Sequence, residues 1–97
     1  MKSEDRPAAD PQVVVRPEFE DWGLLFHPRT GEVMGTNAVG MAIFRLLDGR
    51  ATVEEIARKI QLRFEDSPDT VLTDTLTFLK ALRRKMMVTL NRPSTSE

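Results

Sequence analysis

The sequence contains no cysteine and only one histidine, His27. Without cysteine there are no disulfides, no thiolate zinc or iron–sulfur ligands and no cysteine nucleophile. A single histidine among scattered acids does not supply the three or four ligands of a zinc site. His27 stands beside Pro28 in an expected turn, with no carboxylate placed to orient it, so we interpret it as an exposed turn residue and not as a catalytic base.

Phosphate-binding and nucleophilic motifs are missing too. Neither G-x-G-x-x-G nor the P-loop pattern occurs, and the serines lie in expected tails or at a helix cap, which leaves no catalytic triad. The acidic run Glu18, Glu20 and Asp21 lacks the alternating ligands and the turn glycine of a calcium loop. We therefore expect a protein that is not an enzyme, without catalytic residues, metal or cofactor.

Long hydrophobic runs and a charge excess of one sign are also absent. No stretch reaches the roughly 18 apolar residues of a membrane span, and no signal peptide follows the N-terminal charges, so a cytoplasmic protein without membrane contact is expected. The sequence contains fourteen basic and fifteen acidic residues, so its net charge is close to zero. DNA-binding domains usually carry a clustered basic excess, so no nucleic acid is expected, although a winged-helix DNA-binding transcriptional regulator remains the alternative.

What the sequence does contain is a periodic apolar pattern in a chain that is 40% hydrophobic. Residues 1–11 and 91–97 lack this pattern and are expected to be disordered tails around one domain, residues 12–90. A domain of this size buries only about 60–65% of its unfolded surface and often gains stability from a partner.

Strands are predicted first along the chain. The β-branched residues 13–15 indicate a short strand that Pro17 ends, because proline has no N–H for a ladder. Residues 22–26 alternate as a second strand, residues 27–31 form a turn, and residues 32–36 return as the third strand of the sheet.

Helices follow the strands. Asn37 is expected to cap the first helix, Gly40 to allow its close packing on a neighbour, and Gly49 to end it. Thr52 and Glu55 have the spacing of a capping box at the start of the second helix.

The third helix is expected over about residues 68–85, with Ser67 as its cap and Pro68 in its first position. Its basic C-terminal residues, 83–85, complement the helix dipole, and an acidic partner is the alternative role. Residues 87–90 are expected to form a short strand or to pack against the core. The predicted core stripe of the third helix consists of Val71, Thr75, Phe78, Leu79 and Leu82. Together these elements predict an α+β, winged-helix-like fold, with a three-stranded antiparallel N-terminal sheet followed by three helices.

The third strand is the expected binding edge of this sheet. The opposite edge is flanked by Pro11 and Pro17, whereas residues 32–36 contain no proline and can accept an extended peptide as an added strand. Four backbone hydrogen bonds contribute about 2–6 kcal/mol, but association costs about 4–15 kcal/mol, so apolar contacts must add to them. Leu72 and Leu76 are candidates for these contacts, and secondary core is their alternative role.

Taken in their order along the chain, several segments of the sequence resemble the PqqD family, and together they cover nearly all of the domain. The matching segments are VVRPEFEDWGLLF at residues 14–26, TGEV at 30–33, Asn37, Gly40, LLDG at 46–49, TVEEI at 52–56, Asp74, Phe78 and Leu79. The stretch EFEDW is more similar to PqqD-like proteins of other peptide-modifying cassettes than to the one that serves pyrroloquinoline quinone.

The resemblance implies a peptide chaperone, also called a RiPP recognition element, with a winged-helix-like fold. Such proteins bind the leader segment of a ribosomally made precursor peptide and present it to a modifying enzyme, often a radical SAM enzyme. In the family the leader adds to the third strand and packs against the third helix. The expected peptide-binding residues are therefore Val33, Met34, Gly35 and Thr36 on the strand and, by helical spacing, Leu72, Leu76, Lys80 and Arg84 on the helix. We expect a monomer or a weak dimer, since self-pairing of the edge strand would give a homodimer.

Overall fold

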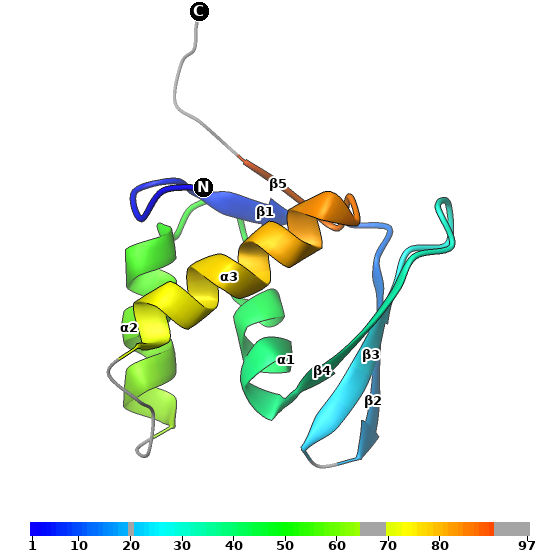
Figure 1. The fold of residues 1–97 in the computed structure, drawn as a ribbon, viewed down its shortest axis with the longest axis horizontal. Helices are drawn as coiled ribbons and strands as arrows, with labels where there is room; N and C mark the ends of the chain where they lie inside the picture. Colours follow the sequence, from blue (N-terminus) through cyan, green and yellow to red (C-terminus); the bar gives the residue numbers. More distant parts are fainter. Residues whose placement is uncertain (20, 65–69, 91–97) are drawn as a thin grey trace, which may run out of the picture.

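A three-stranded antiparallel sheet and three helices form the body of the protein (Figure 1). This computed structural model describes residues 1–19, 21–64 and 70–90. The predicted α+β class, with a sheet followed by three helices, is confirmed. The sheet has the order β2-β3-β4 and consists of β2 (Val14–Phe19), β3 (Trp22–Phe26) and β4 (Val33–Asn37). The helices are α1 (Ala38–Arg45), α2 (Val53–Arg63) and α3 (Val71–Arg84).

The first strand of this sheet runs further than predicted. β2 continues through Pro17 to Phe19, with a register shift between these two residues in its pairing with β3. The expectation that Pro17 ends the strand is wrong because β2 is an edge strand. Alternate backbone groups of an edge strand point to solvent, so a missing N–H at such a position breaks no ladder bond.

A second, two-stranded sheet joins the two ends of the domain. β1 (Pro7–Ala9) pairs antiparallel with β5 (Val88–Leu90), and Pro7 is buried. The prediction of a disordered tail is therefore wrong for residues 7–9, whereas the strand expected near residue 88 is present. The pairing is invisible to local sequence patterns because its two strands lie at opposite ends of the chain. The expected tail 91–97 lies outside the described residues.

The predicted N-caps of the first two helices are confirmed. The side chain of Asn37 accepts a hydrogen bond from the backbone N–H of Gly40 at 2.9 Å. The expectation that Gly49 ends the first helix is wrong, because α1 ends at Arg45 with Leu46 as its C-cap, and Gly49, with a left-handed φ of 79°, lies three residues after that cap. Thr52 and Glu55 form a complete capping box at the start of α2. The backbone N–H of Thr52, donated to the Glu55 carboxylate, lowers the pKa of that carboxyl group.

The core lies where α1 packs against β3 and β4 and where α3 crosses α2 (Figure 1). Within the described residues, α3 begins at Val71, and the expected cap and first residue, Ser67 and Pro68, lie outside them. The predicted core stripe of α3 is confirmed, because four of its members are buried and the fifth, Phe78, is half-buried and packs against the core.

His27 is a core residue and not the exposed turn residue that the sequence predicted. Its side chain is 0% exposed, and its Nε2 lies 3.1 Å from Oδ2 of Asp10. The backbone N–H of Arg29 donates to Nδ1 at 3.3 Å, so we infer that Nε2 carries the proton and donates it to Asp10. The backbone N–H of Gln12 and then His27 lower the pKa of Asp10. The prediction failed because this carboxylate belongs to the segment that was expected to be disordered.

Candidate functional site

The free edge of β4 is defined by the hydrogen-bond alternation of the β3–β4 pair. The backbone N–H of His27 donates to the carbonyl of Glu32 at 2.9 Å just before β4, and that of Ala38 donates to Asp21 at 2.9 Å just after it. Antiparallel pairs alternate between bonded and non-bonded residues. Because β4 faces β3 in a continuous register, its residues alternate between backbone groups directed at β3 and backbone groups directed at the open edge.

The same alternation divides the four strand residues expected at the site. Met34 and Thr36 fall in the bonded class and use their backbone groups on β3, opposite Leu25 and Gly23 respectively. Val33 and Gly35 fall in the other class. Their N–H and C=O groups point away from β3, and β4 is the last strand of its sheet. Two of the four residues therefore present their backbone at the edge.

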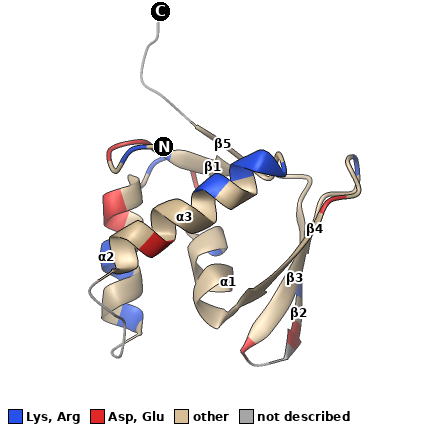
Figure 2. Ribbon diagram, viewed as in Figure 1, with Lys and Arg blue, Asp and Glu red and all other residues tan. Residues whose placement is uncertain are grey.

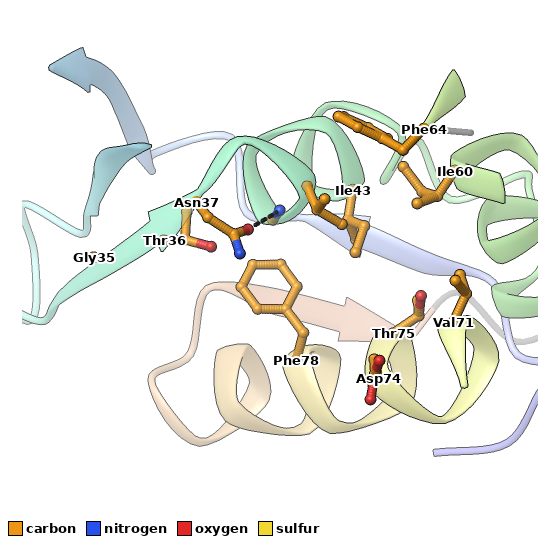
Figure 3. A pocket seen from close by; sticks show the side chains of 12 residues that line it. Gly35, Thr36, Asn37, Ile43, Ile60, Phe64, Val71, Asp74, Thr75 and Phe78 are labelled. Atoms are coloured by element: carbon orange, nitrogen blue, oxygen red, sulfur yellow. Dashed lines mark hydrogen bonds between the residues drawn. The ribbon is translucent and has the colours of Figure 1, made fainter. Parts of the chain in front are cut away.

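Beside this edge a groove runs from β4 between the three helices (Figure 3), with a volume of about 720 Å³. Its wall begins at the end of β4 and continues over α1 to the end of α2 and the first turns of α3. The apolar lining consists of Val39, Gly40, Ile43, Ile60, Phe64, Val71 and Phe78, together with Gly35 of the edge strand. The polar lining consists of Thr36, Asn37, Asp74 and Thr75. Such a mainly apolar cleft with a few polar groups is typical of ligand sites.

The four residues expected on α3 are not among those that line the groove. Leu72, Lys80 and Arg84 are exposed, and Leu76 is half-buried and packs against the core. Successive helix residues are rotated by about 100°, and the groove side of α3 carries residues 71, 74, 75 and 78. The groove therefore lies at the margin of the core stripe and not on the flank that the spacing of the surplus leucines suggested.

Gly40 allows the ring of Phe78 to reach the groove. A Cβ atom at Gly40 would lie 3.2 Å from Cζ of Phe78 and would overlap Oγ1 of Thr36. The prediction that Gly40 permits close packing is confirmed. The sequence identified Phe78 as a core residue, but it held no signal that its ring would form one wall of a groove.

An ion pair ties α3 to the hairpin at the other end of β4. Nζ of Lys85 lies 3.0 Å from Oε1 of Glu32, and both side chains are partly exposed. Such exposed pairs contribute at most about 1 kcal/mol, so this contact adds little to the stability of the fold. Figure 2 shows basic residues gathered at this C-terminal end of α3.

In the part of the chain that the structure describes, no group of three or more His, Asp or Glu side chains is arranged to hold a metal ion. No described helix combines the length and the apolar surface needed to cross a membrane.

Comparisons with known proteins give a family and a structural relative. The model of the family described as coenzyme PQQ synthesis protein D (PqqD) matches residues 23–88, which include the edge strand and every residue that lines the groove. A solved structure described as TbiB1 in complex with the TbiA(beta) leader peptide is 32% identical to this chain, with a TM-score of 0.66. The match covers 84% of this chain and 93% of the other. No curated protein sequence matches.

Proposed function

This chain belongs to the PqqD family, and from this premise we propose that it binds the leader segment of a ribosomally made precursor peptide as a fourth strand on β4. The observation that carries the proposal is the open edge at Val33 and Gly35, which lies directly beside an apolar groove. A relative that is 32% identical was solved with a leader peptide. Edge pairing supplies affinity through the backbone, and the groove supplies selectivity through side chains.

The energetics require both parts of the site. Val33 and Gly35 offer two N–H and two C=O groups, which together contribute about 2–6 kcal/mol at 0.5–1.5 kcal/mol for each bond. Association costs about 4–15 kcal/mol, so the edge by itself does not hold a peptide. Burial of apolar surface contributes about 25 cal/mol per Å². The groove is therefore proposed to bind two or more apolar side chains of the peptide.

We further propose that the protein delivers the bound leader to a separate modifying enzyme, for which a radical SAM enzyme is the candidate, and performs no chemistry itself. Among the described residues, the single histidine cannot act as an accessible base, because its side chain is 0% exposed and both ring nitrogens contact protein groups. A general base has to reach the proton that it removes. The proposed role of the protein is thus to hold the leader peptide and present it to the enzyme.

An amide-shift titration of the labelled protein tests the proposal. The ligand is the leader of a short precursor peptide encoded beside this gene, with the TbiA(beta) leader as a second ligand and a scrambled leader of equal composition as the control. We expect the largest shifts at Val33, Gly35 and the groove residues of α3. A saturable titration whose shifts lie on the outer face of α2, or none with either leader, would exclude this site. Sedimentation in the same samples separates a peptide-binding monomer from an edge-paired dimer.

A further inference from the structure

One buried hydroxyl in the groove has no hydrogen-bond partner within the described part of the chain. Thr75 is 1% exposed, and its Oγ1 has no partner among the described residues, although the residue lines the groove (Figure 3). Thr77, on the exposed side of the same helix, donates its hydroxyl to the carbonyl of Thr73 at 3.0 Å. Buried polar groups nearly always have a partner, and an unpaired one costs free energy. The hydroxyl of Thr75 therefore needs an explanation.

Apolar side chains make up most of the groove that Thr75 lines. Val71 lies on the same helix, while Ile43 and Ile60 reach the groove from α1 and α2 (Figure 3). A valine at position 75 would have nearly the same shape and would leave no polar atom unpaired, so packing alone does not favour threonine here. The hydroxyl oxygen lies just beneath the surface of the groove that Thr75 lines, so a ligand side chain that enters the groove and shifts this lining can satisfy it.

A peptide strand on β4 would direct side chains toward this position. Side chains of a strand alternate between the two faces of a sheet, and Thr36, on the same face of β4 as the groove, belongs to its lining. Alternate side chains of an added strand therefore point to the groove side. There they meet first the ring of Phe78 and the apolar wall, and the Thr75 hydroxyl lies among these groups.

We propose that Thr75 is a specificity-determining residue, whose hydroxyl forms a hydrogen bond with one peptide side chain that enters the groove. This inference rests on the proposed function and adds the class of side chain that is selected. That side chain is apolar along most of its length and carries one hydrogen-bonding atom at its tip, such as a phenol hydroxyl or a side-chain amide. A site with a buried polar group discriminates against the isostere that lacks the partner atom, because the group then stays unpaired.

The test compares matched protein and peptide variants. A phage-displayed library of random short peptides is selected on the wild-type protein, and the tightest peptide is titrated calorimetrically. Each polar side chain of that peptide is then replaced by its apolar isostere, tyrosine by phenylalanine or glutamine by methionine. The protein variants are Thr75→Val, which removes the hydroxyl at constant shape, and Thr75→Ser, which keeps it.

We expect one peptide replacement to weaken binding to the wild type about 3- to 10-fold, which corresponds to one net hydrogen bond. The same replacement should leave the affinity of Thr75→Val unchanged, while Thr75→Ser keeps the preference. The thermal midpoint of Thr75→Val should equal or exceed that of the wild type, which separates lost recognition from lost folding.

Two other outcomes overturn the inference in distinguishable ways. If every replacement has the same effect on the wild type and on Thr75→Val, the hydroxyl selects nothing, as when a buried water satisfies it, and peptide binding at the edge stands. If no selected peptide loses affinity for Gly35→Pro, peptides do not use the β4 edge. The proposed function then fails, and the inference fails with it.

Discussion

The substitution Gly35→Pro tests the edge of β4 at a single backbone group. By the alternation of the β3–β4 pair, the N–H of Gly35 points away from β3. Proline removes that N–H without removing a bond inside the sheet. Pro17 shows that the opposite edge strand of the same sheet already accommodates a proline. Met34→Pro is not equivalent, because the N–H of Met34 points at β3 and its loss would damage the hairpin.

The expected effect follows from the bond that is lost. A peptide carbonyl facing residue 35 would lose its hydrogen bond, which costs about 0.5–1.5 kcal/mol if the carbonyl stays exposed to water and about 1–3 kcal/mol if it is buried and left unpaired. For a buried carbonyl, this loss of about 1–3 kcal/mol corresponds to roughly 5- to 150-fold weaker binding. Gly35→Ala is the matched control, because it keeps the N–H and its Cβ would lie 3.8 Å from Cδ2 of Leu24, an ordinary contact.

The assay is calorimetric titration of the leader peptide into the wild type and both variants, with circular dichroism and thermal unfolding as the test of folding. We expect Gly35→Ala to bind within about threefold of the wild type, because it loses no hydrogen bond. A folded Gly35→Pro variant with the affinity of Gly35→Ala would refute the assignment of the peptide strand to this edge.

Three further predictions concern the framework of the site. Asp10→Ala should lower the free energy of unfolding by about 1–3 kcal/mol in urea denaturation, because it leaves Nε2 of the buried His27 unpaired; an unchanged midpoint would contradict the role of this pair. The pKa of Asp10 is lowered by a backbone N–H and then by His27. Ionised Asp10 therefore adds to the free energy of unfolding above the unfolded pKa of about 3.9, and this stabilisation is lost as the pH falls through the lower pKa of the folded state. The stability of the wild type should therefore drop more steeply below about pH 4 than that of Asp10→Asn, and parallel acid profiles would argue against this. Gly40→Ala should lower both the thermal midpoint and the peptide affinity, since the added Cβ would overlap Oγ1 of Thr36 and press on Phe78, and such overpacking costs about 1–3 kcal/mol and outweighs a helix-propensity gain of up to about 1 kcal/mol. Full peptide affinity in a variant with a lowered midpoint would show that the groove wall at Thr36 and Phe78 is not part of the site.

Local interactions explain the predictions that succeeded. The hairpin of β3 and β4, the N-cap at Asn37 and the capping box of Thr52 with Glu55 are confirmed. Each depends on residues within a few positions of one another, so turn and cap chemistry specify them before any packing occurs. The edge strand followed from the same local patterns, because its two flanking segments were recognised as a turn and a helix start.

Long-range contacts explain the predictions that failed. β1 was missed because its partner, β5, lies at the other end of the chain, and His27 was misjudged because Asp10 comes from that same N-terminal segment. Such contacts stabilise the protein only after folding has brought residues that are distant in sequence together, so no local sequence pattern indicates them.

The fold class, the absence of thiol chemistry and the strand that carries the open edge follow from the amino-acid sequence alone. Tertiary packing sets which backbone groups of that edge are available, which are those of Val33 and Gly35 and not those of Met34 and Thr36. It also decided which side of α3 faces the groove. Periodicity shows which helix residues share a face, but the rotation of the helix about its axis is set by all of its neighbours at once, here β4, α1 and α2. The groove and the unpaired hydroxyl of Thr75 within it are products of that packing.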